Sequence, residues 1–123
     1  MRPRCRSSVG PTTTWQNEAM TDTTTTVQLR RYRLVEGEYD AFLAWWNEWM
    51  PVVRPAAGFA IDFAYGLRES NEFVWAVSAE GDVAAFTALE ETYMASEGRA
   101  RAFEGVPQRV AEYDVRFVDD AVA

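Results

Sequence analysis

The sequence contains no histidine and no lysine, and these two absences remove several common catalytic and ligand-binding groups. Without histidine there is no histidine ligand for haem iron, no histidine-based zinc site and no Ser-His-Asp or Cys-His nucleophile system. Without lysine no Schiff base can form, and no GxxxxGK[ST] or GxGxxG segment is present to hold phosphates. Any catalysis must use carboxylate, arginine, tyrosine, tryptophan, amide or backbone groups.

Cysteine and long apolar runs are also scarce. The single cysteine, Cys5, allows no disulfide within the chain, which is typical of a reducing compartment, so we expect a cytoplasmic protein. No run approaches the roughly 18–20 apolar residues that cross a bilayer, so we expect no membrane-spanning segment. The adjacent carboxylates Glu90-Glu91 and Asp119-Asp120 lack the spacing of a dedicated metal loop. The sequence therefore predicts neither a metal nor a cofactor.

The charge is distributed unevenly along the chain. Residues 1–19 hold three arginines and one glutamate, whereas residues 20–123 hold nine arginines and eighteen acidic residues, which gives the net charge of −7. So acidic a domain repels phosphate backbones and anionic lipid surfaces. We therefore expect neither nucleic acid nor a membrane as a partner.

The first 26 residues resemble a tail because they contain eight threonines, two prolines and few apolar residues. Such a segment buries too little apolar surface to offset the entropy lost on ordering. We interpret residues 1–26 as disordered or as an N-terminal extension assigned in error, with Met20 favoured as the initiator. The folded domain is then predicted over 27–118, followed by a C-terminal tail over 119–123.

Alternating large apolar residues indicate four strands, and helical spacing marks the segments between them. A helix is predicted over 38–54, with Pro51 disturbing its regular hydrogen bonding and Gly58 as its stop. Asp82 is predicted to cap a second helix, and Ser96 a further helical turn. The strands are predicted over residues 27–34, 59–65, 72–78 and 112–117.

This order of elements predicts an α+β, ferredoxin-like βαββαβ fold with a four-stranded antiparallel sheet. The expected order of strands in the sheet is 4-1-3-2. The helices cover only one face of such a sheet, so the other face must be solvated or covered by a partner.

The chain resembles bacterial members of the NIPSNAP family over roughly residues 27–118. The resemblance rests on five short segments in the right order, which are Gln28–Tyr32, Gly37, Pro51 with Gly58, Asn71–Trp75, and Tyr93 through Ser96 to Arg99. It implies a homodimer in which two sheets pack face to face into a dimeric α/β barrel. Relatives in that superfamily include cofactor-free monooxygenases, lactone isomerases and haem-handling enzymes, which is an analogy of fold alone.

Polar residues of the strands form the first candidate site. If the apolar sides of the strands face the helices, these residues face the dimer partner and line a barrel lumen. An arginine beside a tyrosine binds an anionic or enolate-like oxygen through charge-assisted hydrogen bonds. The alternative is that the charges only pair across strands. The residues expected together on this face are Arg30, Tyr32, Asp62, Asp114 and Arg116.

Three further residues are candidates for ligand contact. Trp45 is predicted at the margin of the first helix, where its ring flanks a pocket mouth or a subunit boundary, and Trp75 offers aromatic packing. Arg99 follows a capped turn and is placed to reach a ligand carboxylate. The alternatives are an aromatic edge of the core for Trp45, and for Arg99 a solvated ion pair with Glu90 or Glu97.

Two functions remain open from the sequence. The first is a homodimer that binds a small molecule in the barrel lumen, with Arg30 holding an anion and Tyr32 donating a hydrogen bond. If this protein is catalytic, it is a cofactor-independent enzyme with Asp62 or Asp114 as its base. The second is a non-catalytic protein–protein interaction module whose exposed edge or aromatic rim binds another protein.

Overall fold

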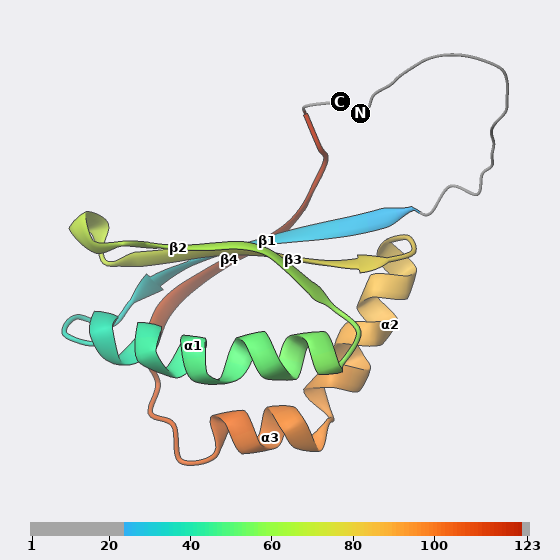
Figure 1. The fold of residues 1–123 in the computed structure, drawn as a ribbon. Helices are drawn as coiled ribbons and strands as arrows, with labels where there is room; N and C mark the ends of the chain where they lie inside the picture. Colours follow the sequence, from blue (N-terminus) through green and yellow to red (C-terminus); the bar gives the residue numbers. More distant parts are fainter. Residues whose placement is uncertain (1–23, 122–123) are drawn as a thin grey trace, which may run out of the picture.

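The structure, a computed structural model, describes residues 24–121 and shows one sheet with helices on one side (Figure 1). The sheet order is β2-β3-β1-β4 and every neighbouring pair is antiparallel, which confirms the predicted ferredoxin-like fold. The elements are β1 Thr25–Leu34, α1 Tyr39–Ala56, β2 Ala60–Leu67, the 3-10 turn η1 Arg68–Ser70, β3 Glu72–Glu80, α2 Val83–Met94, α3 Glu97–Phe103 and β4 Val110–Val118.

The first strand begins earlier than the sequence predicted. β1 starts at Thr25, so Thr25 and Thr26 belong to the sheet and not to the tail predicted over 1–26. Thr26 is buried, and its hydroxyl donates a 2.7 Å hydrogen bond to the backbone carbonyl of the β3–α2 turn. The remainder of that predicted tail, up to residue 23, lies outside the described residues, as do the last two residues of the chain.

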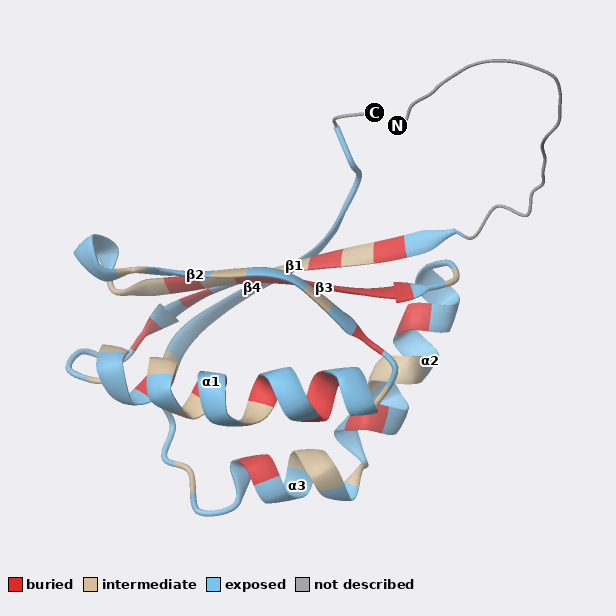
Figure 2. Cartoon of the chain, viewed as in Figure 1, coloured by how far each residue is buried: buried red, intermediate tan, exposed pale blue. Residues whose placement is uncertain are grey.

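All three helices lie on the same side of the sheet, with α3 beyond α1, and the buried residues of this view belong to strands of the sheet and to the helices (Figure 2). We call the other side of the sheet the open face, because no helix of residues 24–121 covers it. No helix in this described part is long and apolar enough to cross a membrane. Aromatic rings dominate the core, which includes Tyr32, Phe42, Trp46, Phe59, Phe73, Trp75, Phe86 and Tyr93.

The side chains of β1 face opposite to the expected direction. Arg30 pairs with Trp75 and Val115 in the neighbouring strands, and directly paired residues share one face. Trp75 is buried under the helices, so Arg30 lies on the helix side of the sheet. The prediction that Arg30 faces a dimer partner is therefore wrong. Burial of Leu34 and Tyr32 in the core fixes this register, because strand side chains alternate with a period of two.

An irregularity in β2 changes which of its residues face the helices. The pairing with β3 shifts between Ile61 and Phe63, so Ile61 pairs with Val77 whereas Phe63 pairs with Ala76. Ile61 consequently lies on the helix side and Phe63 on the open face. A bulge of this kind reverses the alternation that the sequence showed as one continuous pattern.

The helix ends follow the predicted capping residues. The Asp82 side chain accepts a hydrogen bond from the backbone of Ala85 at the start of α2, and the Ser96 side chain accepts one from the backbone of Arg99. The helix α1 continues through Pro51 and ends before Gly58, whose φ of +106° is the left-handed conformation that favours glycine.

Candidate functional site

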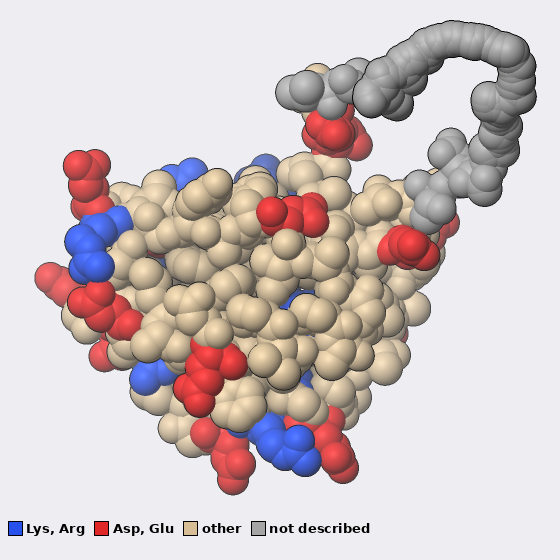
Figure 3. Space-filling view, viewed as in Figure 1, with Lys and Arg blue, Asp and Glu red and all other residues tan. Residues whose placement is uncertain are grey.

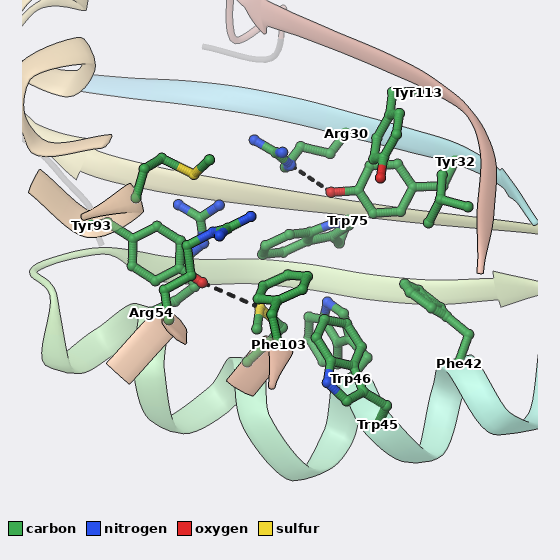
Figure 4. Close-up of a pocket in the computed structure, with 14 residues that line it drawn as sticks. Arg30, Tyr32, Phe42, Trp45, Trp46, Arg54, Trp75, Tyr93, Phe103 and Tyr113 are labelled. Carbon is green, nitrogen blue, oxygen red and sulfur yellow. Dashed lines mark hydrogen bonds between the residues drawn. The ribbon is translucent and has the colours of Figure 1, made fainter. Parts of the chain in front are cut away.

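A cavity of about 290 Å³ lies between the sheet and the helices of this one chain (Figure 4). Its inner wall is built from side chains of β1, β3 and α1, whereas its rim includes the exposed residues Met94, Phe103 and Tyr113. The remaining lining residues are Arg30, Tyr32, Phe42, Trp45, Trp46, Met50, Arg54, Trp75, Tyr93, Arg99 and Val110.

Five of the residues predicted for ligand contact line this cavity. They come from four elements, β1, β3, α1 and α3, which only the tertiary fold brings together. The packing of the helices against the sheet, and not a dimer partner, therefore forms the space they share. These residues are Arg30, Tyr32, Trp45, Trp75 and Arg99.

The other three predicted residues lie on the open face and do not reach the cavity. Asp62 accepts a 2.9 Å hydrogen bond from Ser78, and Asp114 accepts a 2.7 Å bond from Arg116 on its own strand. The prediction that they share a face with Arg30 is wrong, since Asp114 is paired with Arg31 and not with Arg30. Neither aspartate is in position to act as a base for a ligand in the cavity.

Arg54 is a site residue that the sequence prediction missed. Its side chain is buried in the core, with 3% exposed, and its Nη1 lies 2.6 Å from Glu90 Oε1. The guanidinium carbon lies 4.1 Å from the ring centre of Tyr93 and 4.8 Å from that of Phe59. The sequence did contain a signal for its burial, because Trp46, Met50 and Arg54 follow one another at intervals of four, the spacing of one helix face.

Arg30 lies across the cavity from α1 and is held by its own strand. Its Nε donates a 2.7 Å hydrogen bond to the hydroxyl of Tyr32, and its Nη1 donates to the side chain of Gln28. Its Nη1 is also 3.9 Å from Glu90 Oε2, so one carboxylate serves both Arg30 and Arg54. These bonds fix the direction of the guanidinium beside Trp75, whose ring centre is 5.6 Å away.

Tyr93 contributes a neutral hydroxyl to the wall. Burial raises the pKa of its phenol, while the nearby guanidinium groups of Arg54 and Arg99 partly oppose that effect. Its hydroxyl lies 3.8 Å from the sulfur of Met50, which is a weak acceptor. The phenol therefore remains protonated at neutral pH and available as a hydrogen-bond donor.

Trp45 and Arg99 form one side of the entrance. The indole nitrogen of Trp45 donates a 2.7 Å hydrogen bond to the carbonyl of Ala102, and its ring meets Phe103 edge to face. The guanidinium of Arg99 stacks 4.2 Å from the centre of the Phe103 ring. Among residues 24–121 Arg99 forms no ion pair, so the predicted alternative of pairing with Glu90 or Glu97 does not occur.

The cavity is electrostatically unlike the rest of the molecule. Acidic side chains are spread over the face seen in Figure 3, both at its edges and within it, and the net charge of the sequence is −7. The lining nevertheless includes three arginines and no aspartate or glutamate. No group of three or more acidic or cysteine side chains placed to hold a metal ion occurs within the described part of the chain.

No protein-family model matches the sequence, and neither does any curated protein. Solved structures do match its fold. An uncharacterized NIPSNAP domain protein from Burkholderia xenovorans has a TM-score of 0.67 at 16% identity, over 79% of this chain and 95% of that one. A NIPSNAP family protein from Agrobacterium tumefaciens has a TM-score of 0.69 at 10% identity, over 80% and 95%.

A proposed antibiotic biosynthesis monooxygenase from Bacteroides thetaiotaomicron has a TM-score of 0.62 at 16% identity, over 80% of this chain and 90% of that one. These TM-scores establish the fold, whereas identities this low leave the activity open. The chain thus has the fold of bacterial NIPSNAP proteins, as the resemblance in its sequence implied.

Proposed function

We propose that this protein is a bacterial NIPSNAP-family member that binds a small organic molecule in the cavity between its sheet and its helices. The observation that carries this proposal is the composition of the cavity, in which buried aromatic rings surround fixed arginine side chains. Ligand sites are typically concave and mostly apolar, with a few polar groups that set orientation, and about 300 Å³ is the lower end of their usual size. The cavity of about 290 Å³ suits a ligand of one or two rings.

The geometry supports binding more directly than catalysis. The two aspartates proposed as bases from the sequence, Asp62 and Asp114, lie on the other side of the sheet. The carboxylate of Glu90, 3.9 Å from the guanidinium of Arg30, is engaged by Arg54 at 2.6 Å. An enzymatic version of this site would have to use a tyrosine hydroxyl or the ligand's own reactivity.

We further propose that the protein forms a homodimer through its open face. That face presents Phe63 and Tyr65, which are 37% and 65% exposed and whose rings stack at 5.6 Å. Exposed apolar patches of this kind mark interaction sites, and a two-fold axis would place the same patch on both partners. The second candidate function, a module that binds a different protein, would use this same surface.

The binding proposal is tested with matched arginine variants of β1. We expect aromatic fragments to raise the melting temperature of the wild-type protein, because a ligand at 100 times its Kd adds about 2.7 kcal/mol to stability. Arg30→Gln should weaken their binding, whereas Arg33→Gln, on the open face of the same strand, should not. The proposal is wrong if no fragment binds, or if both variants bind every fragment as the wild type does.

A further inference from the structure

The polar groups of the cavity wall are strongly biased toward hydrogen-bond donors. Guanidinium and indole nitrogens can only donate, and in this lining they belong to Arg30, Arg54, Arg99, Trp45, Trp46 and Trp75. The indole nitrogen of Trp45 already donates to the carbonyl of Ala102. The tyrosine hydroxyls can donate or accept. The lining includes no carboxylate and no side-chain amide. A ligand that matches this wall must carry acceptors, whereas a ligand with donors of its own would find side-chain oxygen acceptors only in the tyrosine hydroxyls.

Three of these donors have no hydrogen-bond partner among the described residues. They are the Nε of Arg54 and the indole nitrogens of Trp46 and Trp75, and all three atoms are buried. The parent side chains are almost fully enclosed, with 3%, 6% and 2% exposed. Trp46 and Arg54 belong to α1 and Trp75 to β3, so these donors come from both sides of the cavity. Buried polar groups in folded proteins are normally paired, so three unpaired donors among the residues that line one cavity indicate that an acceptor is missing there.

The arginines of the wall also exceed their counter-charges. Glu90 is the carboxylate that faces both Arg54, at 2.6 Å, and Arg30, at 3.9 Å. Arg99 at the entrance has no ion-pair partner in the described part of the chain. One carboxylate therefore balances three guanidinium groups, and the cavity keeps an excess positive charge that an anion would neutralise.

The apolar part of the wall consists mainly of flat rings. Trp46 and Trp75 meet at 5.3 Å with nearly perpendicular planes, and Phe42 and Tyr32 meet edge to face at 6.0 Å. Aromatic walls of this kind stabilise a planar guest through stacked and edge-on contacts. Shape and polarity thus select the same class of ligand.

We infer that the ligand is a planar aromatic anion, an aryl carboxylate or a phenolate or enolate of a ring system, whose oxygen is bound by Arg54 and Arg30. This inference rests on the proposed binding function and specifies its ligand. Glu90 is then a positioning residue. It holds Arg54 in place and, by its own charge, sets how strongly the arginines attract the ligand oxygen.

The first experiment compares naphthalene derivatives that differ in charge, by titration calorimetry on the full chain. We expect 2-naphthoate to bind, 2-naphthamide to bind at least tenfold more weakly, and 2-naphthylmethylammonium to show no measurable binding. Hexanoate, an anion without a ring, should also bind at least tenfold more weakly than 2-naphthoate. The inference is overturned if the amide, the ammonium or hexanoate equals 2-naphthoate, or if 2-naphthoate does not bind.

These outcomes separate the inference from the function on which it rests. Binding of the amide or the ammonium overturns the anion but leaves a small-molecule site in the cavity. The binding function itself fails if none of these probes and none of the fragments binds, or if Arg30→Gln binds every fragment as the wild type does. The two failures therefore give different patterns in the same titrations.

The second experiment tests Glu90 and Arg54 with substitutions that change charge more than shape. Glu90→Gln keeps an oxygen for Arg54 but removes the negative charge, so 2-naphthoate should bind severalfold more tightly. A purely structural role for Glu90 would weaken binding of every probe alike. Unchanged or weaker binding of 2-naphthoate to Glu90→Gln would overturn the inference.

Arg54→Met should weaken 2-naphthoate binding roughly ten- to a hundredfold, the range for losing a hydrogen bond to a charged group. Arg54→Met leaves the charge of Glu90 without its partner, which can destabilise the fold. The double variant Arg54→Met/Glu90→Gln removes both charges together and is made in parallel, because we expect it to keep the fold. Arg68→Gln, an exposed arginine paired with Asp40 outside the cavity, is the matched control and should bind as the wild type does. Wild-type affinity in the folded double variant would rule out Arg54 as the anion contact.

Discussion

Arg54 carries a positive charge into an aromatic core, which is costly unless the charge is compensated. Three features of its surroundings compensate it, namely the Glu90 carboxylate at 2.6 Å, the ring of Tyr93 and the ring of Phe59. A buried ion pair of this kind often contributes little net stability, although breaking it is expensive. Its position beside the cavity therefore supports a role in binding rather than in folding.

Tyr93 gives a prediction at the scale of one residue. Since burial raises the pKa of its phenol, the folded protein holds this proton more tightly than the unfolded chain does. The contribution of the protonated phenol to the free energy of unfolding is fully present below about pH 10, the ordinary pKa of tyrosine. It is lost as the pH rises through the raised pKa of Tyr93 in the folded protein. Tyr93→Phe should therefore lose less stability than the wild type as the pH rises above about 10.

Urea unfolding at fixed protein concentration measures this difference. Tyr65→Phe, which changes an exposed tyrosine on the open face, serves as the control and should follow the wild-type curve. Equal losses of stability in the wild type and Tyr93→Phe would show that burial of this phenol does not perturb its titration.

Among the elements, α1 does most to shape the cavity. Its buried side contributes Phe42, Trp46, Met50 and Arg54, while Pro51 and Pro55 are exposed on the other side. The helix continues through both prolines, each of which removes one backbone donor, so packing against the sheet compensates for the lost hydrogen bonds. The position of α1 over β2 and β3 therefore decides how much room remains beside Trp75.

The contact between the start of α1 and β2 gives a prediction at the scale of elements. A Cβ built on Gly66 would lie 2.1 Å from the hydroxyl of Tyr39, so Gly66→Ala must displace that side chain. We expect a loss of roughly 1–3 kcal/mol, the usual cost of overpacking. Urea unfolding of both single variants and of Tyr39→Ala/Gly66→Ala measures this coupling.

The double variant is the informative one in this cycle. Once Tyr39 is truncated, the alanine at position 66 meets Leu43 at an ordinary 3.4 Å and should cost much less. If the two changes are simply additive, the close approach of helix and strand does not limit this position.

For the whole molecule, the decisive feature is a sheet with helices on only one side (Figure 1). Its open face combines exposed Phe63, Tyr65 and Val118 with ion pairs such as Arg31–Glu72 at 2.8 Å. Ion pairs this exposed contribute little stability by themselves. The apolar residues between them favour a second copy of the chain as the cover for this face.

The homodimer gives a prediction at this largest scale. Light scattering after size exclusion should show twice the protomer mass of 14.0 kDa at micromolar concentration. Phe63→Glu should shift the protein to single protomers, because a charge would be buried without a partner in the interface. Val52→Glu, at a 64% exposed position on α1, introduces the same charge away from this face and should leave the dimer intact.

A folded wild-type protein with the mass of one protomer would show that the open face is simply solvated. A folded dimer of unchanged mass in Phe63→Glu would instead place the interface elsewhere. In either result the cavity would be unaffected, because it lies within one protomer.

The sequence by itself determined the order of elements, their capping residues and the arrangement of the sheet. Asp82 and Ser96 cap the helices as predicted, because capping depends on a few neighbouring residues. The order β2-β3-β1-β4 follows from the alternation of apolar residues together with the short connections between elements. Five of the eight predicted contact residues also line one cavity, although the sequence placed Arg30 and Tyr32 in a lumen between two sheets and not between one sheet and its helices. Their contact with a ligand stays a prediction.

Only the tertiary structure decided which face of each strand meets the helices. The burial of Tyr32 fixes the direction of β1, so Arg30 faces the core, and Asp114, paired with Arg31, faces away from it. The shift between Ile61 and Phe63 acts separately on β2 and turns Phe63 to the open face. A displacement of one residue reverses every side chain of a strand, and local pattern cannot fix it when both faces carry apolar residues. The partnership of Arg54 with Glu90 was likewise hidden, because it joins two helices whose relative position depends on the packing of the whole core.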